Sequence, residues 1–477
     1  MNAHDSERME GVLRAHGWVA AEAVHEADLV VLNTCSVREK AEQKLRSEVG
    51  KLAPLKHARP DLVVCVAGCV AQQEGERLLA RIRHVDLVIG PDNIPELPKL
   101  VLEQRAGALP VARTVFDVEL PRFLAAEPEP GDAPVSALVT TMKGCDERCS
   151  FCVVPYTRGP ERYRPAREIV DEIQRFTQAG AREVLLLGQT VDSYRDPSLP
   201  PPESADPDES QFPALLGAIA HEVPALLRLR YTSPHPRHAT ASLARAHAEL
   251  DVLARHVHLP AQSGSDRVLK RMIRRYTRAE YTGRARRLLA ARPGMTMSTD
   301  IIVGFPGETE ADFEETLGLL RDIGFIQVYA FAFSPRPHTP ALKLVDDVAS
   351  EKKSERLARV LELVDAQGRA HLASLVGSTQ RVLVYGRSKT GDSFEGRTDK
   401  NEIVHVDAPA DLSLVGEEVS VDIVRANKHS LGGRLVSGEA DRVKAAGSGR
   451  RVASRRRRLL PVVTGDSSSP GTTLSRS

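Results

Sequence analysis

The chain of 477 residues has few aromatic side chains, few cysteines and almost no net charge. Aromatic residues make up 4% of the sequence, which contains a single tryptophan. No apolar run approaches the roughly 18 residues that a membrane-spanning helix needs, and no signal peptide opens the sequence. We therefore expect a cytoplasmic protein that has no membrane partner.

The charge balance and the cysteine content exclude two further classes of protein. With 65 Lys and Arg against 64 Asp and Glu, the net charge is +1, so any nucleic-acid contact must come from local patches. Six cysteines in a chain of this length, at spacings typical of ligands, do not match a secreted disulfide framework. The cysteines are Cys35, Cys65, Cys69, Cys145, Cys149 and Cys152.

Three of these cysteines, Cys145, Cys149 and Cys152, have the spacing C-x3-C-x2-C directly after the apolar run at 135–139. Three thiolates in one loop can hold three irons of a [4Fe–4S] cube, which leaves one iron open to a small chelating molecule. The alternatives are a zinc knuckle and a reduced redox pair. Zinc usually needs a fourth Cys or His nearby, and none follows before His221. The spacing therefore favours an iron–sulfur cluster.

Residues 1–119 alternate short apolar runs with helical stretches, which predicts a doubly wound α/β domain with a parallel sheet. In such sheets, binding sites gather at the carboxyl ends of the strands. We expect strands over residues 29–32, 62–66 and 86–89, and helices over residues 7–16, 37–51 and 72–81. Residues 1–6 have the character of a loop, although such a domain normally begins with a strand.

Two cysteines directly follow the first two expected strands. Cys35 comes after Asn33-Thr34 and Cys69 comes after Gly68, so both thiols are expected at one edge of the sheet. Cys65 lies inside the second strand, where a cysteine usually acts as a small apolar residue. Two thiolates are too few for a conventional cluster, so this edge lacks a full ligand set.

Long motifs are similar to those of the MiaB family of tRNA methylthiotransferases, which are radical S-adenosylmethionine (SAM) enzymes. They are Asn-Thr-Cys-Ser-Val-Arg-Glu-Lys at 33–40, Gly-Cys-Val-Ala-Gln-Gln at 68–73 and Cys-Val-Val-Pro-Tyr-Thr-Arg-Gly at 152–159. The resemblance implies that Cys145, Cys149 and Cys152 hold a [4Fe–4S] cluster whose open iron binds SAM. One electron then cleaves SAM to a 5′-deoxyadenosyl radical.

The resemblance also implies a second, auxiliary [4Fe–4S] cluster with Cys35 and Cys69 among its ligands. In the family, an N-terminal strand ends in Gly-Cys-Gln-Met-Asn, and this chain begins at Met1-Asn2. We therefore expect a true start upstream that supplies a third cysteine. The alternative is a two-cysteine auxiliary site with help from Cys65.

After a Pro- and acid-rich linker at 120–133, residues 134–370 contain six further strand-like runs, most of them followed by helical stretches. Six βα units predict a curved parallel sheet, which is a partial (β/α)6 version of the eight-fold barrel and the radical SAM domain of the resemblance. Strands are expected over residues 136–142, 183–188, 227–232, 256–260, 297–303 and 325–333, and helices over residues 166–179, 212–221, 240–250, 278–291 and 310–323.

The loops after these strands carry polar and glycine-rich clusters, and chemistry in barrels gathers at this end of the strands. Segments 258–265 (His-Leu-Pro-Ala-Gln-Ser-Gly-Ser) and 300–309 (Asp-Ile-Ile-Val-Gly-Phe-Pro-Gly-Glu-Thr) match blocks of the family pattern. By resemblance these loops line the SAM and substrate cavity. The implied SAM-binding residues are Gln189, Ser233, Gln262, Ser263, Asp300 and Glu308.

A run of basic residues lies between residues 267 and 287, and it is either a solvated helix face or a surface that contacts RNA phosphates. Residues 374–438 are expected to form a small all-β barrel that resembles the TRAM domain, an RNA-binding module. Its strands are expected over residues 379–385, 394–398, 403–407 and 418–423. Residues 439–477 are expected to be a disordered basic tail. The basic residues expected on the barrel are Lys389, Arg397, Lys400, Arg425 and Lys428.

By resemblance, the enzyme is a transferase that attaches a methylthio group to C2 of N6-isopentenyladenosine at tRNA position 37, next to the anticodon. The C2–H bond is unactivated, so a radical is required. The resemblance also implies that the auxiliary cluster carries the sulfur and that a second SAM provides the methyl group. The expected partners are the anticodon arm of tRNA and an electron donor such as flavodoxin or ferredoxin, and the expected state is a monomer.

Two alternatives stay open from the sequence. Sister families methylthiolate threonylcarbamoyl-adenosine in tRNA or an aspartate in a ribosomal protein. The stretches at 36–44 and 157–162 favour the isopentenyl type, but Thr190 and Asp192 stand where the family usually has Asn. The alternative from another class is a non-catalytic RNA-binding metalloprotein.

Overall fold

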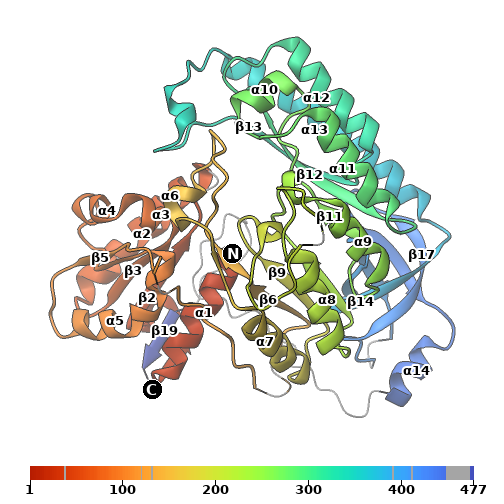
Figure 1. The fold of residues 1–477 in the computed structure, drawn as a ribbon. Coiled ribbons are helices and arrows are strands. Elements are labelled where there is room, and N and C mark those ends of the chain that lie inside the picture. Colours follow the sequence, from red (N-terminus) through yellow and green to blue (C-terminus); the bar gives the residue numbers. More distant parts are fainter. Residues whose placement is uncertain are drawn as a thin grey trace.

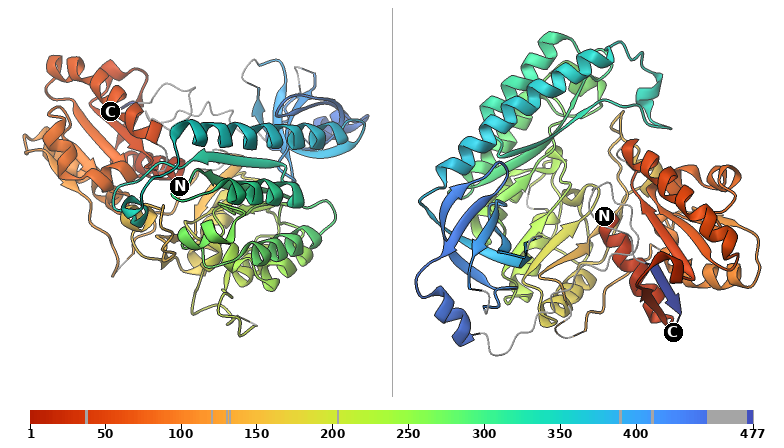
Figure 2. Two further views of the ribbon diagram at one scale, coloured as in Figure 1. Left: turned by 90° about the horizontal axis from the view of Figure 1, so that it is seen from above. Right: turned by 180° about the vertical axis from the view of Figure 1, so that it is seen from behind.

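The computed structural model describes residues 1–36, 39–119, 121–129, 131, 133–202, 204–388, 391–409, 412–446 and 473–476. An N-terminal α/β domain, a central curved α/β domain and a small β-barrel follow one another along the chain (Figure 1). Figure 2 shows the N-terminal domain and the β-barrel on opposite sides of the central domain. This architecture confirms the fold class expected from the sequence.

The N-terminal domain is built on one sheet with helices on both faces. Its elements are α1 (Asn2–Ala15), β1 (Trp18–Ala21), β2 (Leu29–Thr34), α2 (Glu39–Ala58), β3 (Val63–Gly68), α3 (Cys69–Glu74), α4 (Glu76–Arg81), β4 (Leu87–Ile89), α5 (Leu97–Arg105) and β5 (Val111–Arg113). Strands β2 to β5 run parallel. Met9 of α1 and Leu97 of α5 pack on one face, and Leu45 of α2 and Leu78 of α4 pack on the other. The sheet is therefore doubly wound.

The first turn of α1 differs from the expected loop over residues 1–6. The helix begins at Asn2. The Asn33 side-chain amide, at the end of β2, donates to the Asn2 carbonyl at 2.9 Å and to the Ser6 hydroxyl at 2.8 Å. These tertiary contacts hold the start of α1 against the sheet, so the expectation of a loop is wrong.

Two other helices of this domain have different bounds from those expected. The single helix expected over residues 72–81 is two helices, α3 and α4, because Gly75 at φ +49° turns the chain between them. Helix α2 continues past the expected end at 51 and includes Pro54. Local sequence therefore placed the helices but not their ends.

The central domain contains the six expected strands. Its elements are β6 (Ser136–Thr140), β7 (Met142–Lys143), α6 (Val154–Arg158), β8 (Arg162–Tyr163), α7 (Ala166–Gln178), β9 (Glu183–Leu187), α8 (Phe212–Glu222), β10 (Arg228–Tyr231), α9 (Ala241–Glu249), β11 (His256–His258), α10 (Asp266–Arg271), α11 (Arg278–Ala290), β12 (Thr296–Val303), α12 (Glu310–Ile323), β13 (Gln327–Ala332) and α13 (Ser350–Ser374). The six expected strands form two parallel sheets, β6-β9-β10 and β11-β12-β13, and an isolated parallel bridge joins Leu229 of β10 to Leu253, just before β11. The result is an open, partial barrel.

The C-terminal module is a closed barrel. Its strands are β14 (Thr379–Arg387), β15 (Phe394–Thr398), β16 (Ile403–Asp407), β17 (Glu418–Ala426) and β18 (Leu431–Leu435), and their order around the barrel is β14-β15-β16-β18-β17. Strand β18 was not expected, because Gly432 and Gly433 lower its intrinsic β-propensity. A Cβ atom at Gly433 would lie 2.5 Å from Val421 Cγ1, so close packing in the barrel requires glycine there.

The C-terminal tail differs in two segments from the disordered tail expected over 439–477. Helix α14 (Glu439–Ala446) follows the barrel directly, and strand β19 (Thr473–Arg476) pairs antiparallel with β1 and β2 of the N-terminal sheet. Residues 447–472 and 477 lie outside the described residues.

Buried ion pairs join the domains. Arg162 Nη1 lies 2.5 Å from Asp92 Oδ2, which connects the central domain to the N-terminal one. At the other side, Arg228 Nη2 lies 3.0 Å from Glu418 Oε1, and Tyr385 Oη of the barrel donates to Glu183 Oε1 at 3.0 Å. Glu183 and Arg228 are the first residues of β9 and β10, so the barrel lies at the amino ends of these strands. Among the described residues, no helix is both long enough and apolar enough to cross a membrane.

Candidate iron–sulfur and SAM site

The cysteine loop of the central domain connects β7 to α6 and carries Cys145, Cys149 and Cys152. Gly144 opens the loop at φ +77°. A Cβ atom at this position would lie 1.8 Å from the Pro160 carbonyl oxygen, so only glycine allows this close approach. The sequence thus forces a tight turn immediately before the first thiol.

Backbone contacts hold the middle of the loop against the segment that follows α10. Ser150 donates its backbone N–H to the Met272 carbonyl at 2.9 Å and its hydroxyl to the Arg271 carbonyl at 2.9 Å. Both bonds lie within the stretch between Cys149 and Cys152. The loop is therefore positioned by tertiary contacts as well as by its own turn.

The loop thiols are free and lie in a low-dielectric environment. Cys145 Sγ lies 2.9 Å from Thr190 Oγ1, just after β9. Burial raises the pKa of Cys145 above its usual range and the pKa of Cys152 to about 12. Both thiols therefore stay protonated at neutral pH without metal, and metal binding would release their protons.

A buried guanidinium reaches this loop from the segment after α10. Arg274 Nη1 donates to Cys149 Sγ at 3.1 Å, Nε donates to the Tyr276 hydroxyl at 2.8 Å, and Nη2 donates to the Pro260 carbonyl at 3.2 Å. Burial alone would lower the pKa of Arg274, but Tyr276 and Cys149 raise it above its usual value. The guanidinium therefore stays charged beside the thiol.

The backbone on both sides of Arg274 is strained. Ile273 has φ 58° and Arg275 has φ 49°, and both are non-glycine residues in the left-handed region. Each such residue costs about 1–3 kcal/mol and persists only where the surrounding structure over-determines it. The strain shows that the fold holds Arg274 in this one direction.

The second cysteine site lies at the carboxyl edge of the N-terminal sheet. Thr34 of β2 and Gly68 of β3 are paired in the parallel ladder, so Cys35 and Cys69 each follow a paired residue. Cys69 is buried and begins α3. The structure thus places both thiols at one edge, as expected from the sequence.

A buried guanidinium also reaches this second site. Arg158, the last residue of α6, donates from Nε to Cys69 Sγ at 3.3 Å, and its Nη2 lies 2.5 Å from Asp5 Oδ2. Burial would raise the pKa of Asp5, but the charge of Arg158 dominates and holds it below its usual range. The ion pair is therefore fully formed at neutral pH.

The two cysteine sites are neighbours in space. Helix α3, which begins at Cys69, packs against α6, which follows Cys152. Figure 1 shows the two short helices side by side between the domains. Cys65 is different, because it is fully buried in β3 and belongs to the apolar core with Met9 and Leu29. It packs as a small apolar residue.

The residues at the central site fit a cluster and a polar ligand in their chemistry. Among the described residues, no three His, Cys, Asp or Glu side chains form a ready-made metal site. Three free thiols on one loop nevertheless match the ligands of an iron–sulfur cube. Around them, the buried atoms Glu147 Oε2, Gln189 Oε1, Asp192 Oδ2 and His235 Nε2 have no hydrogen-bond partner in the described part of the chain. Such atoms require a ligand or water.

Among these residues, Asp192 has a strongly raised pKa. Asp192 Oδ1 accepts the His235 backbone N–H at 2.7 Å, and burial raises the pKa of this carboxyl to about 7. Glu147, inside the cysteine loop, lies 3.4 Å from Arg237 and 3.7 Å from His238. A polar network therefore surrounds the cysteine loop at the carboxyl ends of β9 and β10.

Four of the six residues implied in SAM binding have unusual features: three lie on loops, and Asp300 lies in β12. Ser233 has φ 62° and Gln262 has φ 70°, and strained non-glycine residues of this kind cluster at ligand sites. Gln189 has the unpartnered buried oxygen described above. Asp300 Oδ2 lies 3.3 Å from His258 Nε2. Their role in SAM binding stays a prediction.

The other two implied residues also contact neighbouring helices. The Ser263 hydroxyl lies 3.3 Å from that of Thr316 in α12. Glu308 Oε2 lies 2.8 Å from Arg356 in α13, while its Oε1 has no partner among the described residues. These contacts support the fold, and the assignment of both residues to SAM also stays a prediction.

The basic run between residues 267 and 287 does not form one continuous free surface. Arg274 is buried at Cys149. Other members pair with nearby acids: Arg267 with Asp312, Arg278 with Asp322, and Arg284 with Asp208. The run is therefore in part structural, because Arg274 is buried and three further arginines have acidic partners.

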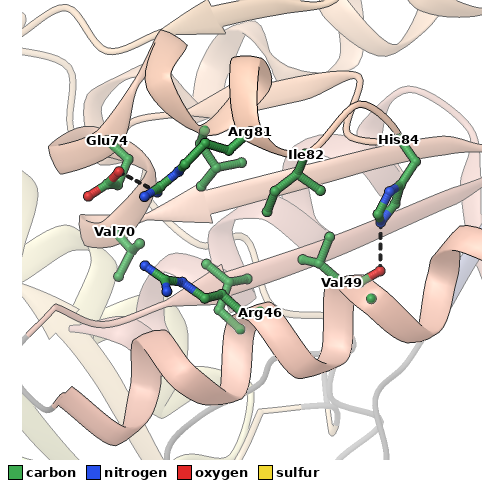
Figure 3. Close-up of a pocket in the computed structure, with 10 residues that line it drawn as sticks. Arg46, Val49, Val70, Glu74, Arg81, Ile82 and His84 are labelled. Carbon is green, nitrogen blue, oxygen red and sulfur yellow. Dashed lines mark hydrogen bonds and ion pairs between the residues drawn. The ribbon is translucent and has the colours of Figure 1, made fainter.

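A cavity of about 310 Å³ lies between α2 and α4 of the N-terminal domain (Figure 3). Val49 and Val70 line it, and Arg81 and Glu74 form an ion pair of 2.5 Å at one side. At the other side, the His84 ring lies 2.8 Å from the Val49 carbonyl. None of its lining residues is a cysteine, although Val70 directly follows Cys69.

Comparison with known proteins agrees with this geometry. Three family models match: uncharacterized protein family UPF0004 over residues 1–90, the radical SAM superfamily over residues 139–320 and the TRAM domain over residues 373–436. The tRNA-2-methylthio-N(6)-dimethylallyladenosine synthase of Sorangium cellulosum is 60% identical over 485 residues, which cover 98% of this chain and 97% of that protein. The chain belongs to the radical SAM tRNA methylthiotransferase family.

Other members and more distant structures extend the comparison. The tRNA-2-methylthio-N(6)-dimethylallyladenosine synthase of Methylobacillus flagellatus is 44% identical over 91% of this chain and 97% of its own. The structure of the radical SAM methyltransferase TsrM from Kitasatospora setae is 15% identical, with a TM-score of 0.48 over 74% of this chain and 67% of that one. Membership of the methylthiotransferase family confirms the resemblance drawn from the motifs, and with it the assignment of SAM and a [4Fe–4S] cluster as cofactors.

Sequence reasoning missed two residues of this methylthiotransferase that contact the thiols. Arg158 lies inside a motif used for the resemblance, but nothing in the motif shows that its side chain reaches Cys69. Arg274 was counted in a basic surface run. A charged residue buried at a cysteine leaves no periodic pattern in the sequence, so no local signal distinguishes it from its exposed neighbours.

Proposed function

We propose that this chain catalyses the 2-methylthiolation of N6-isopentenyladenosine at position 37 of tRNA. The observation that carries the proposal is the adjacency of two cysteine sites, one on the loop before α6 and one at the start of α3. The reaction needs a radical generator and a sulfur source close to one base. The name shared by relatives at 60% and 44% identity supports the isopentenyl type over the threonylcarbamoyl and aspartate alternatives.

Within this proposal, Cys145, Cys149 and Cys152 hold the cluster, and the polar atoms near Gln189 and Asp192 face SAM. Bound there, the cluster and SAM would supply the one-electron, radical chemistry that the unactivated C2–H bond of the adenine requires. The protein orients the thiols through its turns and hydrogen bonds and keeps Cys145 and Cys149 buried. Burial excludes water, which would otherwise quench reactive species.

The finer assignments belong to the same proposal. Cys35 and Cys69 contribute to an auxiliary [4Fe–4S] cluster that supplies sulfur, and Arg158 holds Cys69 at the face next to α6. A second SAM provides the methyl group. A cytoplasmic location, a flavodoxin or ferredoxin as electron donor, and a monomeric state stay predictions.

We place the tRNA on a surface that includes the β-barrel. Arg425 pairs with Asp407 and Lys428 pairs with Asp365, each at 3.2 Å and largely exposed. Exposed ion pairs contribute about 0–1 kcal/mol, so a phosphate can replace the acid at little cost. Lys389, also expected on this surface, lies outside the described residues.

Nucleoside mass spectrometry tests the proposal. The chain is expressed in a bacterial strain that makes isopentenyladenosine in tRNA but lacks its own methylthiotransferase. We expect the methylthio-isopentenyl nucleoside to appear with the unchanged chain and to be absent with Cys149→Ala. A methylthio-threonylcarbamoyl nucleoside instead would support the sister substrate. No new nucleoside, with RNA binding intact, would support a non-catalytic RNA-binding metalloprotein.

A further inference from the structure

Arg274 differs from every other buried arginine in the described part of the chain. Seven arginines are buried there, and six of them have a carboxylate within ion-pair distance. These pairs are Arg8–Glu172, Arg158–Asp5, Arg162–Asp92, Arg164–Glu172, Arg228–Glu418 and Arg356–Glu308. No described carboxylate lies at that distance from Arg274. A buried cation without a paired anion is costly, so an anion must come from elsewhere.

The contacts of Arg274 leave one side chain that can supply this anion. The Pro260 carbonyl cannot ionise, and burial raises the pKa of Tyr276 to about 12, so its hydroxyl stays neutral. The third partner is Cys149 Sγ, at 3.1 Å. A cysteine that binds a metal does so as a thiolate, which is an anion.

We propose that Arg274 is the charge partner of the Cys149 thiolate and raises the reduction potential of the cluster on the cysteine loop. This inference rests on the proposed role of Cys145, Cys149 and Cys152 as cluster ligands. Net charge and hydrogen bonds to the sulfurs set the potential of such clusters. The reduced cluster carries one more negative charge than the oxidised one, so a fixed positive charge favours reduction.

The surrounding structure keeps the guanidinium fixed relative to the loop. The left-handed residues Ile273 and Arg275 flank Arg274, and Ser150 bonds to the carbonyls of the same segment. Both bonds of Ser150, which follows Cys149, join the loop to this segment on the N-terminal side of Arg274. The Tyr276 hydroxyl and the Pro260 carbonyl accept hydrogen bonds from the guanidinium and fix its direction. Arg274 is thus a positioning residue whose charge is held in place before any ligand binds.

A redox titration followed by electron paramagnetic resonance tests this inference. The chain carries Cys35→Ala and Cys69→Ala, so that only the loop cluster forms after anaerobic reconstitution. Arg274→Met removes the charge, Arg274→Lys keeps it, and Arg164→Met is the matched control, because Arg164 is a buried arginine that contacts no cysteine. We expect the equilibrium for reduction to fall about tenfold in Arg274→Met, which corresponds to 59 mV for one electron. Arg274→Lys should shift less, and the control should not shift.

The outcomes separate this inference from the proposed function. An unchanged potential in Arg274→Met with a full complement of about four irons would overturn the role of Arg274. Loss of iron in Arg274→Met that Arg274→Lys restores would support it, because the charge would then be needed for the thiolate to bind. If Arg274→Met does not fold, Arg274→Gln takes its place, with the same expected shift. If Cys145→Ala retains all the iron, the assignment of the cysteine loop fails, whatever Arg274 does.

Discussion

The two cysteine sites share one arrangement, an arginine bonded to a cysteine sulfur, but they differ in whether a carboxylate pairs with that arginine. At each, a buried arginine donates a hydrogen bond to a cysteine sulfur, Arg158 to Cys69 and Arg274 to Cys149. At the N-terminal sheet, Asp5 pairs with the arginine at 2.5 Å. At the central loop, no described carboxylate does so. The charge of Arg158 is therefore neutralised by a carboxylate of the protein, whereas no described carboxylate neutralises the charge of Arg274.

The buried acids show the same contrast. The ion pair with Arg158 holds the pKa of Asp5 below its usual range despite burial. Burial raises the pKa of Asp192, at the central site, to about 7, because no arginine pairs with it. Buried ionisable groups without an ion-pair partner in the described part of the protein, here Arg274 and Asp192, indicate a ligand-binding site. The ligands that we propose for this site are a metal cluster and SAM.

The largest expected effect is on catalysis, and it comes from replacing one cysteine at each of the two sites. Cys149→Ala should abolish SAM cleavage, because the cluster loses a ligand, whereas Cys69→Ala should leave cleavage and abolish only methylthiolation. Chromatography of 5′-deoxyadenosine and of tRNA nucleosides measures both. If Cys69→Ala also abolishes cleavage with the loop cluster intact, the two sites are not independent and the comparison fails.

Removal of one partner from the Arg158–Asp5 ion pair should lower the free energy of unfolding by several kcal/mol. Arg158→Met leaves Asp5 buried and unpaired, so we expect the free energy of unfolding to fall by about 3–5 kcal/mol. Asp5→Asn together with Arg158→Met should cost less than the sum of the single changes. Urea denaturation of the four proteins measures the coupling. A cost below about 1 kcal/mol for Arg158→Met would show that the pair is not buried in solution.

The unpaired acid should make stability depend on pH. The folded pKa of Asp192, about 7, lies above the unfolded value of about 3.9, so the folded state holds the proton more tightly. The stability that this proton contributes is complete below about pH 4 and is lost as the pH rises toward and past 7. Asp192→Asn, which installs the residue usual in the family, should remove this loss.

We expect the difference in unfolding free energy between Asp192→Asn and the unchanged chain to grow by about 2–4 kcal/mol between pH 5 and pH 8. Urea denaturation across this range measures it. Comparison of the two proteins at each pH cancels the contributions of the other titrating groups. A constant difference would mean that Asp192 is ionised in the folded protein, and the contrast with Asp5 would disappear.

The smallest expected effect is on stability, from loss of the uncharged contact between Thr190 and Cys145 at the central site. Thr190→Val keeps the shape of the side chain but removes the hydroxyl that lies 2.9 Å from Cys145 Sγ. The net worth of such a bond is about 0.5–1.5 kcal/mol, so the metal-free protein should lose about that much unfolding free energy. Thermal denaturation measures it. Thr177→Val, which removes a hydroxyl bonded to its own helix, is the control. A loss above about 3 kcal/mol would mean that Thr190 serves more than this one contact.

Local patterns predicted most elements of the fold for identifiable reasons. Strand β15 and helix α12 have the expected bounds, because alternation defines the strand and the Thr309–Asp312 capping box defines the start of the helix. The start of α1 and strand β18 were missed. The first depends on Asn33, far along the chain, and the second on space that only glycine leaves beside Val421.

The sequence by itself determined which residues can hold a cluster, because Cys145, Cys149 and Cys152 share one loop and their spacing is local. It also determined that Cys35 and Cys69 lie at one edge, because both follow parallel strands. Only the tertiary structure decided which charges meet these thiols. Arg158 is 89 residues from Cys69, and Arg274 is 125 residues from Cys149. Contacts over such separations depend on how whole elements pack, and no periodicity along the chain records them.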